Sequence, residues 1–197
     1  MLITAAAGGV GTAAVQLSVK LGCEVYGMVG SQEKIEFIKN LGAIEGFNYR
    51  NPDYFKKLVA STGGVDIVIE MVGGDVFRKS INLLRPFGRI VVAGFASMDV
   101  KKWNPITWIK TCRDIPRISV RKMAEKSIAV MSTHIGYLLD EDPNLLMGIY
   151  NDMRSFVTKR HIRPVISKVF PFHEATEAHR FIESRKSYGK VLLKVDV

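Results

Sequence analysis

From residue 1 to residue 94, short apolar runs alternate with longer stretches in which apolar side chains recur every three or four positions. Short continuous apolar runs are typical of parallel strands covered on both faces, and the second spacing is typical of helices with one buried face. The expected strands are residues 1–4, 23–29, 43–48, 65–70 and 89–94, with a sixth at 127–133. This alternation predicts an α/β fold built on a doubly wound parallel sheet of six strands.

Beyond residue 100 the pattern changes. Residues 101–126 are rich in Lys and Arg, contain Trp103 and Trp108, and show no strand alternation. We interpret them as a helical insertion over a ligand cleft, and a basic amphipathic loop that packs on a partner domain is an equal alternative. A further helix is expected to begin at Asp142, because apolar residues at helical spacing follow it.

A glycine-rich turn lies between the first expected strand and the helix after it. Its spacing, Ala5-x-x-Gly8-x-x-Gly11, is a variant of the G-x-G-x-x-G fingerprint, in the strand–turn–helix context that this fingerprint requires. Glycines let the backbone approach a pyrophosphate, and the helix N-terminus offers that anion unpaired N–H groups and partial positive charge. A tight turn that serves only packing is the alternative.

The end of the second expected strand indicates which dinucleotide is bound. An NAD enzyme places an acidic residue about 20 residues after the glycine turn, where it binds the ribose 2′-hydroxyl. Here Gly30 and Ser31 occupy that place, and Lys34 follows one helical turn later. A hydroxyl and an ammonium suit a 2′-phosphate, so the sequence favours NADPH over NADH. Ser31 also fits the N-cap of the next helix with Lys34 solvated, and it can serve both roles.

The last part of the chain has a different pattern. Residues 163–170 alternate like an antiparallel strand, residues 173–185 have helical spacing, and residues 191–195 form another apolar run. We therefore divide the chain into a dinucleotide-binding domain, residues 1–160, and a strand–helix–strand tail, residues 161–197, which belongs to a second domain that is only partly present.

Composition narrows the class of protein. With 197 residues, 47% of them hydrophobic, the chain can form one ordinary domain and an appendage. No apolar run approaches the ~18 residues of a membrane span and no leader pattern opens the chain, so we expect a soluble, cytoplasmic protein. Cys23 and Cys112 are too few for a disulfide framework or a four-cysteine zinc site. The net charge of +9 suits a polyanionic small ligand, and contact with nucleic acid or membrane is the least favoured alternative.

Several motifs follow one another in a specific order along the chain. They are residues 6–11, Ser31 with Lys34, residues 48–50, 72–74, 88–94 and 189–193. Together they resemble the cofactor-binding half of the medium-chain dehydrogenases, in the zinc-free quinone oxidoreductase branch. Residues 117–126 and 161–166 are similar to the subgroup around the vesicle amine transport protein. The resemblance spans essentially the whole chain and implies a Rossmann fold, bound NADPH and no metal.

The resemblance also implies roles for individual residues. These are Gly8, Gly9, Val10 and Gly11 for the NADPH pyrophosphate; Ser31, Lys34 and Tyr49 for the 2′-phosphoadenosine; Val72 and Gly73 under the adenosine ribose and adenine; Gly94, Phe95 and Ala96 at the nicotinamide end; and main chain near Ser132, Thr133 and His134 for the carboxamide. No acid–base pair is visible and the histidines are scattered, so the catalytic residues are unknown.

The chain departs from this family in one large respect, because family members carry a domain-sized catalytic module ahead of the glycine turn. A natural domain rarely begins inside its central strand, so we expect a segment to precede Met1 in the intact protein. The resemblance implies hydride transfer to quinones or α,β-unsaturated carbonyl compounds, with poor turnover by this chain alone. The alternatives are a non-catalytic NADPH-binding scaffold or sensor, and the enoyl reductase domain of a multidomain polyketide-type synthase. Family members commonly pair the edge strands of two cofactor sheets, which predicts a homodimer through residues 128–132.

Overall fold

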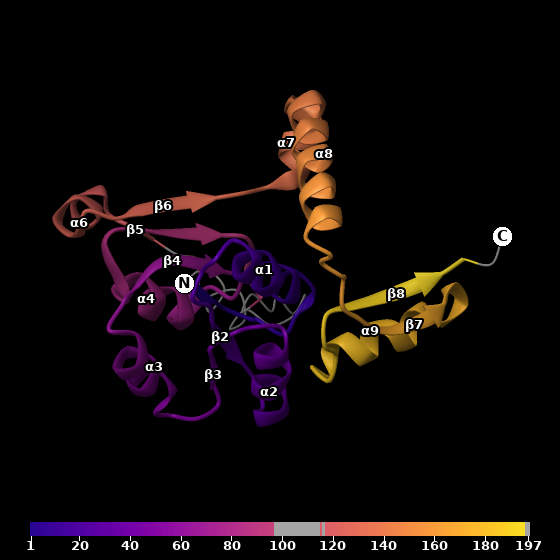
Figure 1. Ribbon diagram of the computed structural model, residues 1–197, viewed down its shortest axis with the longest axis horizontal. Helices are drawn as coiled ribbons and strands as arrows, with labels where there is room; N and C mark the ends of the chain where they lie inside the picture. Colours follow the sequence, from indigo (N-terminus) through magenta and orange to yellow (C-terminus); the bar gives the residue numbers. More distant parts are fainter. Residues whose placement is uncertain (97–114, 116, 196–197) are drawn as a thin grey trace, which may run out of the picture.

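A computed structural model describes residues 1–96, 115 and 117–195 of the chain. Its largest element is a six-stranded sheet in the order β3-β2-β1-β4-β5-β6 (Figure 1), in which each pair of neighbours is parallel. The strands are β1 (Leu2–Ile3), β2 (Tyr26–Val29), β3 (Glu45–Asn48), β4 (Val65–Glu70), β5 (Leu84–Val92) and β6 (Ala129–Ser132). The predicted α/β fold with a six-stranded, doubly wound parallel sheet is confirmed.

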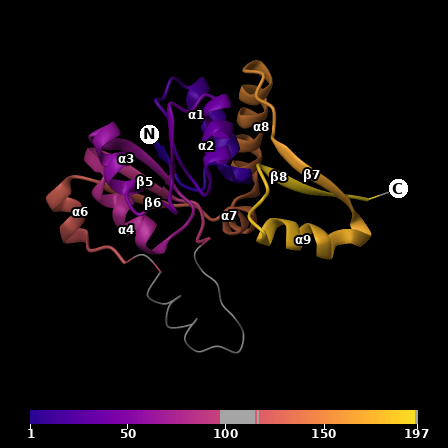
Figure 2. The same cartoon turned by 90° about the horizontal axis from the view of Figure 1, so that it is seen from below.

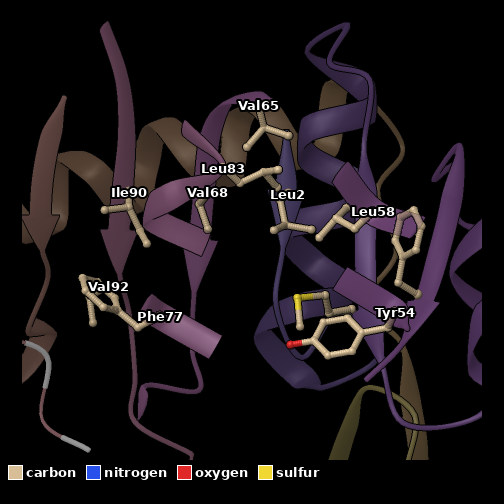
Figure 3. Close-up of a cluster of buried hydrophobic side chains, with 11 residues drawn as sticks. Leu2, Tyr54, Leu58, Val65, Val68, Phe77, Leu83, Ile90 and Val92 are labelled. Carbon is tan, nitrogen blue, oxygen red and sulfur yellow. The ribbon is translucent and has the colours of Figure 1, made fainter. Parts of the chain in front are cut away.

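Helices cover both faces of the sheet (Figure 2). The elements α1 (Gly9–Lys20) and α2 (Gln32–Asn40) pack on one face, and α3 (Tyr54–Thr62) and α4 (Gly74–Asn82) pack on the other. Adjacent residues of the central strand β1 point to opposite faces. Leu2 belongs to the cluster beneath α3 and α4 (Figure 3), whereas Ile3 belongs to the cluster beneath α1 and α2. Both residues are fully buried, as expected for a strand covered on both sides.

The start of β5 differs from the sequence prediction. The strand is expected at residues 89–94, but β5 already begins at Leu84. Its pairing with β4 shifts register between Val65 and Ile67, and Phe87 adopts a φ of 64°. This irregularity lets a Pro- and Gly-containing segment run on into the strand, because a bulge absorbs residues that the regular ladder cannot pair.

The elements after β5 match the sequence prediction in part. The helix α6 (Val120–Lys126) forms the end of the basic segment, and most of that segment, residues 97–114 and 116, lies outside the described residues. The helix α7 (Ile135–Glu141) was not predicted. The helix α8 (Pro143–Lys159) begins where expected, because the Asp142 carboxylate accepts a hydrogen bond from the Leu145 N–H at 2.9 Å. Among the helices that the structure describes, none has the length and apolar character that crossing a bilayer requires.

The tail is a strand–helix–strand unit, as predicted. It consists of β7 (Ile166–Pro171), a short 3-10 turn η1 (Phe172–Glu174), α9 (Ala175–Glu183) and β8 (Lys190–Lys194). The expectation that its first strand is antiparallel is wrong, since β7 and β8 pair in parallel. Alternation of apolar and polar residues indicates only that one face of a strand is more buried than the other. The crossover through α9 returns the chain to the same end of the sheet, and this sets the direction.

The tail lies against the beginning of the chain. The Gly189 N–H donates to the Ala7 carbonyl oxygen at 2.8 Å, and Gly8 and Gly189 form an isolated parallel bridge. The rings of Phe37 and Tyr188 meet edge to face with centroids 4.9 Å apart. These contacts bring the tail to the glycine turn and to α2, which are the two segments predicted to bind phosphate.

Candidate functional site

A cleft of about 510 Å³ opens at the carboxyl ends of the parallel strands. The central strand β1 lies between β2 and β4, so the chain leaves the sheet in opposite directions on its two sides. Open α/β sheets bind ligands at such a switch point. The predicted site residues that line the cleft are Gly8, Lys34, Tyr49, Val72 and Ala96.

A second cavity, of about 280 Å³, lies at the opposite ends of the strands, near Met1, Tyr26 and Asp66. Ligands of open parallel sheets bind at the carboxyl ends of the strands, and this cavity is at the amino ends. Arg85, one of the residues that line it, already pairs with Asp66 at 3.5 Å. We therefore place the candidate site in the larger cleft.

The glycine turn brings the start of α1 close to β1. Gly8 is the N-cap of α1, and among the described residues no side chain caps the helix. The N–H groups of its first turn have no partner within the helix. A Cβ on Gly11 would clash with the Ala5 carbonyl oxygen, so only glycine permits this approach of helix to strand. Ala5 adopts a φ of 47°, which turns the chain sharply out of β1. The helix start can thus offer amide donors and its positive end to an anion.

A lysine from the tail lies across the same helix start. A Cβ on Gly9 would lie 2.8 Å from Cδ and 3.4 Å from Nζ of Lys190, the first residue of β8. The first turn of α1 contains no acidic residue. An ammonium next to a positive helix end is favourable only when an anion lies between them. Sequence reasoning missed Lys190, because only the folded tail brings it to the glycine turn.

Ser31 and Lys34 lie together at the start of α2. Ser31 is the N-cap, and its Oγ accepts a hydrogen bond from the Lys34 N–H at 3.3 Å, which confirms the capping role. The Lys34 ammonium donates to the carbonyl oxygens of Arg185 and Ser187 at 2.8 and 2.9 Å, and so holds the tail over the cleft. Burial, and to a smaller extent the charge of Arg50, lower the pKa of Lys34. An anion beside these two cations would relieve their repulsion.

A basic pocket of about 310 Å³ adjoins the cleft at Ser31. The charged residues that line it are Lys34, Arg50, Arg185 and Lys186, with one carboxylate, Glu33. The Tyr49 hydroxyl lies over Gly30, since a Cβ there would be 2.6 Å from this oxygen. The excess of positive charge suits a phosphate group. Arg185 and Lys186 were missed from the sequence, although an adjacent Arg–Lys pair just before the last strand was a usable signal.

Val72 and Gly73 lie where the chain leaves β4. Val72 lines the cleft. Gly73 is the N-cap of α4 and adopts a φ of 85°, which favours glycine. The structure therefore brings Val72 together with Gly8, Lys34 and Tyr49, although these residues come from four different segments.

The residues predicted for the nicotinamide end follow β5. Ala96 lines the cleft, and its N–H donates to the Met71 carbonyl oxygen at 2.9 Å. A Cβ on Gly94 would lie 3.6 Å from that same oxygen, and Phe95 is 44% exposed. These residues therefore lie beside the end of β4, and their role at the nicotinamide stays a prediction.

Ser132, Thr133 and His134 lie at the end of the edge strand β6. The Thr133 N–H donates to the Val92 carbonyl oxygen at 3.2 Å. The His134 Nδ1 accepts the Tyr137 N–H at 2.9 Å and caps α7. Neither residue is among those that line the cleft, so their role in holding a carboxamide stays a prediction.

Within the ranges that the structure describes, no three or more His, Cys, Asp or Glu side chains gather as metal ligands would. Structural zinc takes four such ligands and catalytic zinc at least three.

Comparison with known proteins places this geometry in a family. The family model for zinc-binding dehydrogenases matches residues 9–146. The human synaptic vesicle membrane protein VAT-1 homolog is 33% identical over 98% of this chain and 49% of its own length, and bovine quinone oxidoreductase-like protein 2 is 31% identical over 99% and 52%. A highly reducing polyketide synthase, cm3B, of Cordyceps militaris is 30% identical over 99% of this chain and 7% of its own length.

Two solved structures have the same arrangement of elements. Escherichia coli quinone oxidoreductase, complexed with NADPH, superposes with a TM-score of 0.77 at 27% identity, over 98% of this chain and 56% of that one. The quinone oxidoreductase of Thermus thermophilus, also solved with NADPH, has a TM-score of 0.75 at 29% identity, over the same shares. The chain spans about half the length of VAT-1 homolog and of the quinone oxidoreductase-like protein that it matches. With the family model covering most of it and the Rossmann sheet intact, the chain belongs to the zinc-binding dehydrogenases, the medium-chain dehydrogenase/reductase family.

Proposed function

We propose that the chain is the NADPH-binding part of an oxidoreductase that transfers hydride to quinones or α,β-unsaturated carbonyl compounds. The observation that carries this proposal is the basic pocket beside Ser31, with Lys34, Arg50 and Arg185 next to a strand end that lacks the acidic residue of NAD enzymes. The NADPH complexes of two quinone oxidoreductases with this fold support the choice of cofactor.

In this proposal the chain binds and orients the cofactor, and NADPH supplies the hydride. The start of α1 and Lys190 hold the pyrophosphate through amide donors and one ammonium. Lys34, Arg185 and the Tyr49 hydroxyl hold the 2′-phosphate. Val72 and Ala96 form an apolar wall along the cleft. The catalytic contribution of these residues is position and exclusion of water, and no acid–base residue is assigned.

We also propose that residues 161–197 belong to a second domain that another segment completes. The sheet of β7 and β8 has two strands, which is marginal without further cover. Its apolar side chains Ile166, Val169 and Leu193 are exposed, and α8 exposes Ile149 and Met153. A chain half as long as VAT-1 homolog is expected to leave such surfaces open, so turnover requires the remaining half.

The substrate has a second candidate class. The match to highly reducing polyketide synthases favours an enoyl thioester, reduced by the same hydride transfer within a multidomain protein. A non-catalytic NADPH sensor is the third candidate. Assays of the full-length gene product with a quinone and with an enoyl thioester separate the three, because the sensor oxidises NADPH with neither. A homodimer through β6 and a cytoplasmic location are parts of the same proposal, to be tested by light scattering and by fractionation.

The proposal is tested by displacement. NADPH fluorescence is followed while the chain is added, and the bound cofactor is then competed with 2′,5′-ADP or with 5′-AMP. We expect 2′,5′-ADP to displace NADPH at a concentration at least 10-fold lower than 5′-AMP, because charge-assisted hydrogen bonds to the 2′-phosphate contribute about 1.5–3 kcal/mol. Equal potency of the two competitors would contradict a 2′-phosphate site.

A further inference from the structure

A carboxylate with no role in the proposed hydride transfer is buried beneath the cleft. Glu70 is the last residue of β4 and is 0% exposed. Its Oε1 accepts the Val72 N–H at 2.8 Å, and both carboxylate oxygens accept the Gly73 N–H, at 3.1 and 3.0 Å. Buried carboxylates are rare unless they are paired or bind hydrogen-bond donors. Here the donors are the backbone of the segment that enters the cleft wall.

Thr4 extends this network to the neighbouring strand. Its hydroxyl donates to Glu70 Oε1 at 3.3 Å and accepts the Met71 N–H at 2.8 Å. Thr4 follows β1, so these bonds join the chain ends of β1 and β4, the two strands that flank the crevice. Three successive N–H groups, from Met71 to Gly73, are thereby fixed by two side chains.

The network reaches the surface of the cleft. Val72 lines the cleft, and the Met71 carbonyl oxygen accepts the N–H of Ala96, which lines it as well. Gly73 adopts a φ of 85°, and its N–H donates to both oxygens of the Glu70 carboxylate. A shift of Glu70 would therefore move the two apolar residues of the wall together.

The burial of Glu70 opposes its ionisation. Burial raises the pKa of Glu70, against the opposing effect of its hydrogen bonds from Val72, Gly73 and Thr4. A raised pKa favours folding below the ordinary value of about 4.5, and this contribution is lost as the pH rises through the pKa of the folded state. The hydrogen bonds from Val72 and Gly73 give both oxygens a local structural role.

We propose that Glu70, assisted by Thr4, is a positioning residue of the nucleotide cleft, which fixes residues 71–73 in the geometry that cofactor binding needs. This inference rests on the proposed NADPH binding. Its direct consequence is that substitution of Glu70 changes NADPH affinity more than it changes the stability of the fold. An amide in place of the carboxylate leaves one acceptor oxygen for the N–H groups of Val72 and Gly73, and its NH₂ group, which is a donor, replaces the other oxygen.

The test compares NADPH titrations and thermal unfolding of the wild-type chain with those of Glu70→Gln and Val65→Ala. Val65 lies at the other end of β4 and is buried, so its truncation lowers stability away from the cleft. We expect Glu70→Gln to weaken NADPH binding roughly 10-fold, because its NH₂ group faces a backbone N–H of residues 72–73 that the second carboxylate oxygen had accepted. Its melting temperature is expected to be at least as high as that of Val65→Ala. Val65→Ala is expected to have a lower melting temperature than the wild type, and an NADPH affinity within about twofold of the wild-type value.

Thr4→Val and Thr4→Ser supply a second pair. The valine is nearly isosteric but removes the hydroxyl, whereas the serine retains it. We expect weaker NADPH binding in Thr4→Val and recovery in Thr4→Ser, and this pair decides the matter if Glu70→Gln does not fold. If Glu70→Gln folds and binds NADPH as tightly as the wild type, the positioning role is overturned. If only Thr4→Val folds, unchanged NADPH affinity in that variant overturns it. Absence of NADPH binding in the wild-type chain would instead overturn the proposed function, on which the inference rests.

Discussion

At the scale of residues, the site depends on short side chains that let segments approach one another. Gly11 lets α1 pack closely against the end of β1, and Gly30 leaves room for the Tyr49 hydroxyl. Ser31 was predictable, because an N-cap serine has a local signature in sequence. The partners of Lys34 were not predictable, because they are carbonyl oxygens of Arg185 and Ser187, more than a hundred residues away along the chain. A sequence pattern predicts hydrogen bonds between residues close in the chain. Contacts between distant segments can be identified only once the fold is known.

Gly11→Ala tests the close approach of α1. Its Cβ would clash with the Ala5 carbonyl oxygen and lie 2.7 Å from backbone atoms of Ala6, and backbone cannot yield as a flexible side chain can. We expect a loss of about 3 kcal/mol in the free energy of unfolding, together with weaker NADPH binding. Urea denaturation measures the first effect. The matched control is Gly148→Ala, within α8 and with nothing within 4 Å of its Cβ, which should gain about 0.5–1 kcal/mol. Equal stability of the two variants would contradict this account of the turn.

At the scale of elements, the sequence predicted the positions of the strands well and the residues at which they begin less well. Continuous apolar runs marked β4 and the end of β5, because a parallel strand covered on both faces needs them. The start of β5 was missed, since Pro86 and Gly88 resemble a turn and are instead absorbed by a bulge. The predicted antiparallel direction of β7 was wrong, because alternation of apolar and polar residues does not indicate the direction of the partner strand.

The helix α8 carries a prediction about the second domain. Ile149 and Met153 lie one turn apart and are about half exposed, on a helix that projects from the sheet (Figure 1). In the isolated chain, the double variant Ile149→Lys and Met153→Lys is expected to bind less of an apolar dye such as ANS and to keep its melting temperature within a few degrees. In the full-length protein the same variant should lose stability. A large loss of stability in the isolated chain would show that these side chains already belong to a core.

At the scale of the whole molecule, the cofactor cleft is assembled from both ends of the chain. The glycine turn comes from residues near the start, and Arg185, Lys186 and Lys190 come from the tail. The sequence therefore identified residues on the Rossmann sheet that line the cleft, because motifs and strand order determine their position. The Arg185–Lys186 pair was a usable signal in the sequence, but the position of the tail at the cleft could not be predicted, because it depends on the contacts of Gly189 with the glycine turn and of Tyr188 with α2.

The central claim is that this cleft selects NADPH through its 2′-phosphate pocket. The most direct measurement is the ratio of NADH to NADPH dissociation constants for the wild-type chain, Lys34→Ala and Lys39→Ala. Lys34 lines the pocket, whereas Lys39 lies further along the same helix and is absent from the pocket lining. We predict a ratio of at least about 10 for the wild type and for Lys39→Ala, and a drop of roughly 10-fold for Lys34→Ala, because one charge-assisted contact with the phosphate is lost. A ratio near one in the wild type, or the same ratio in all three proteins, would contradict the claim.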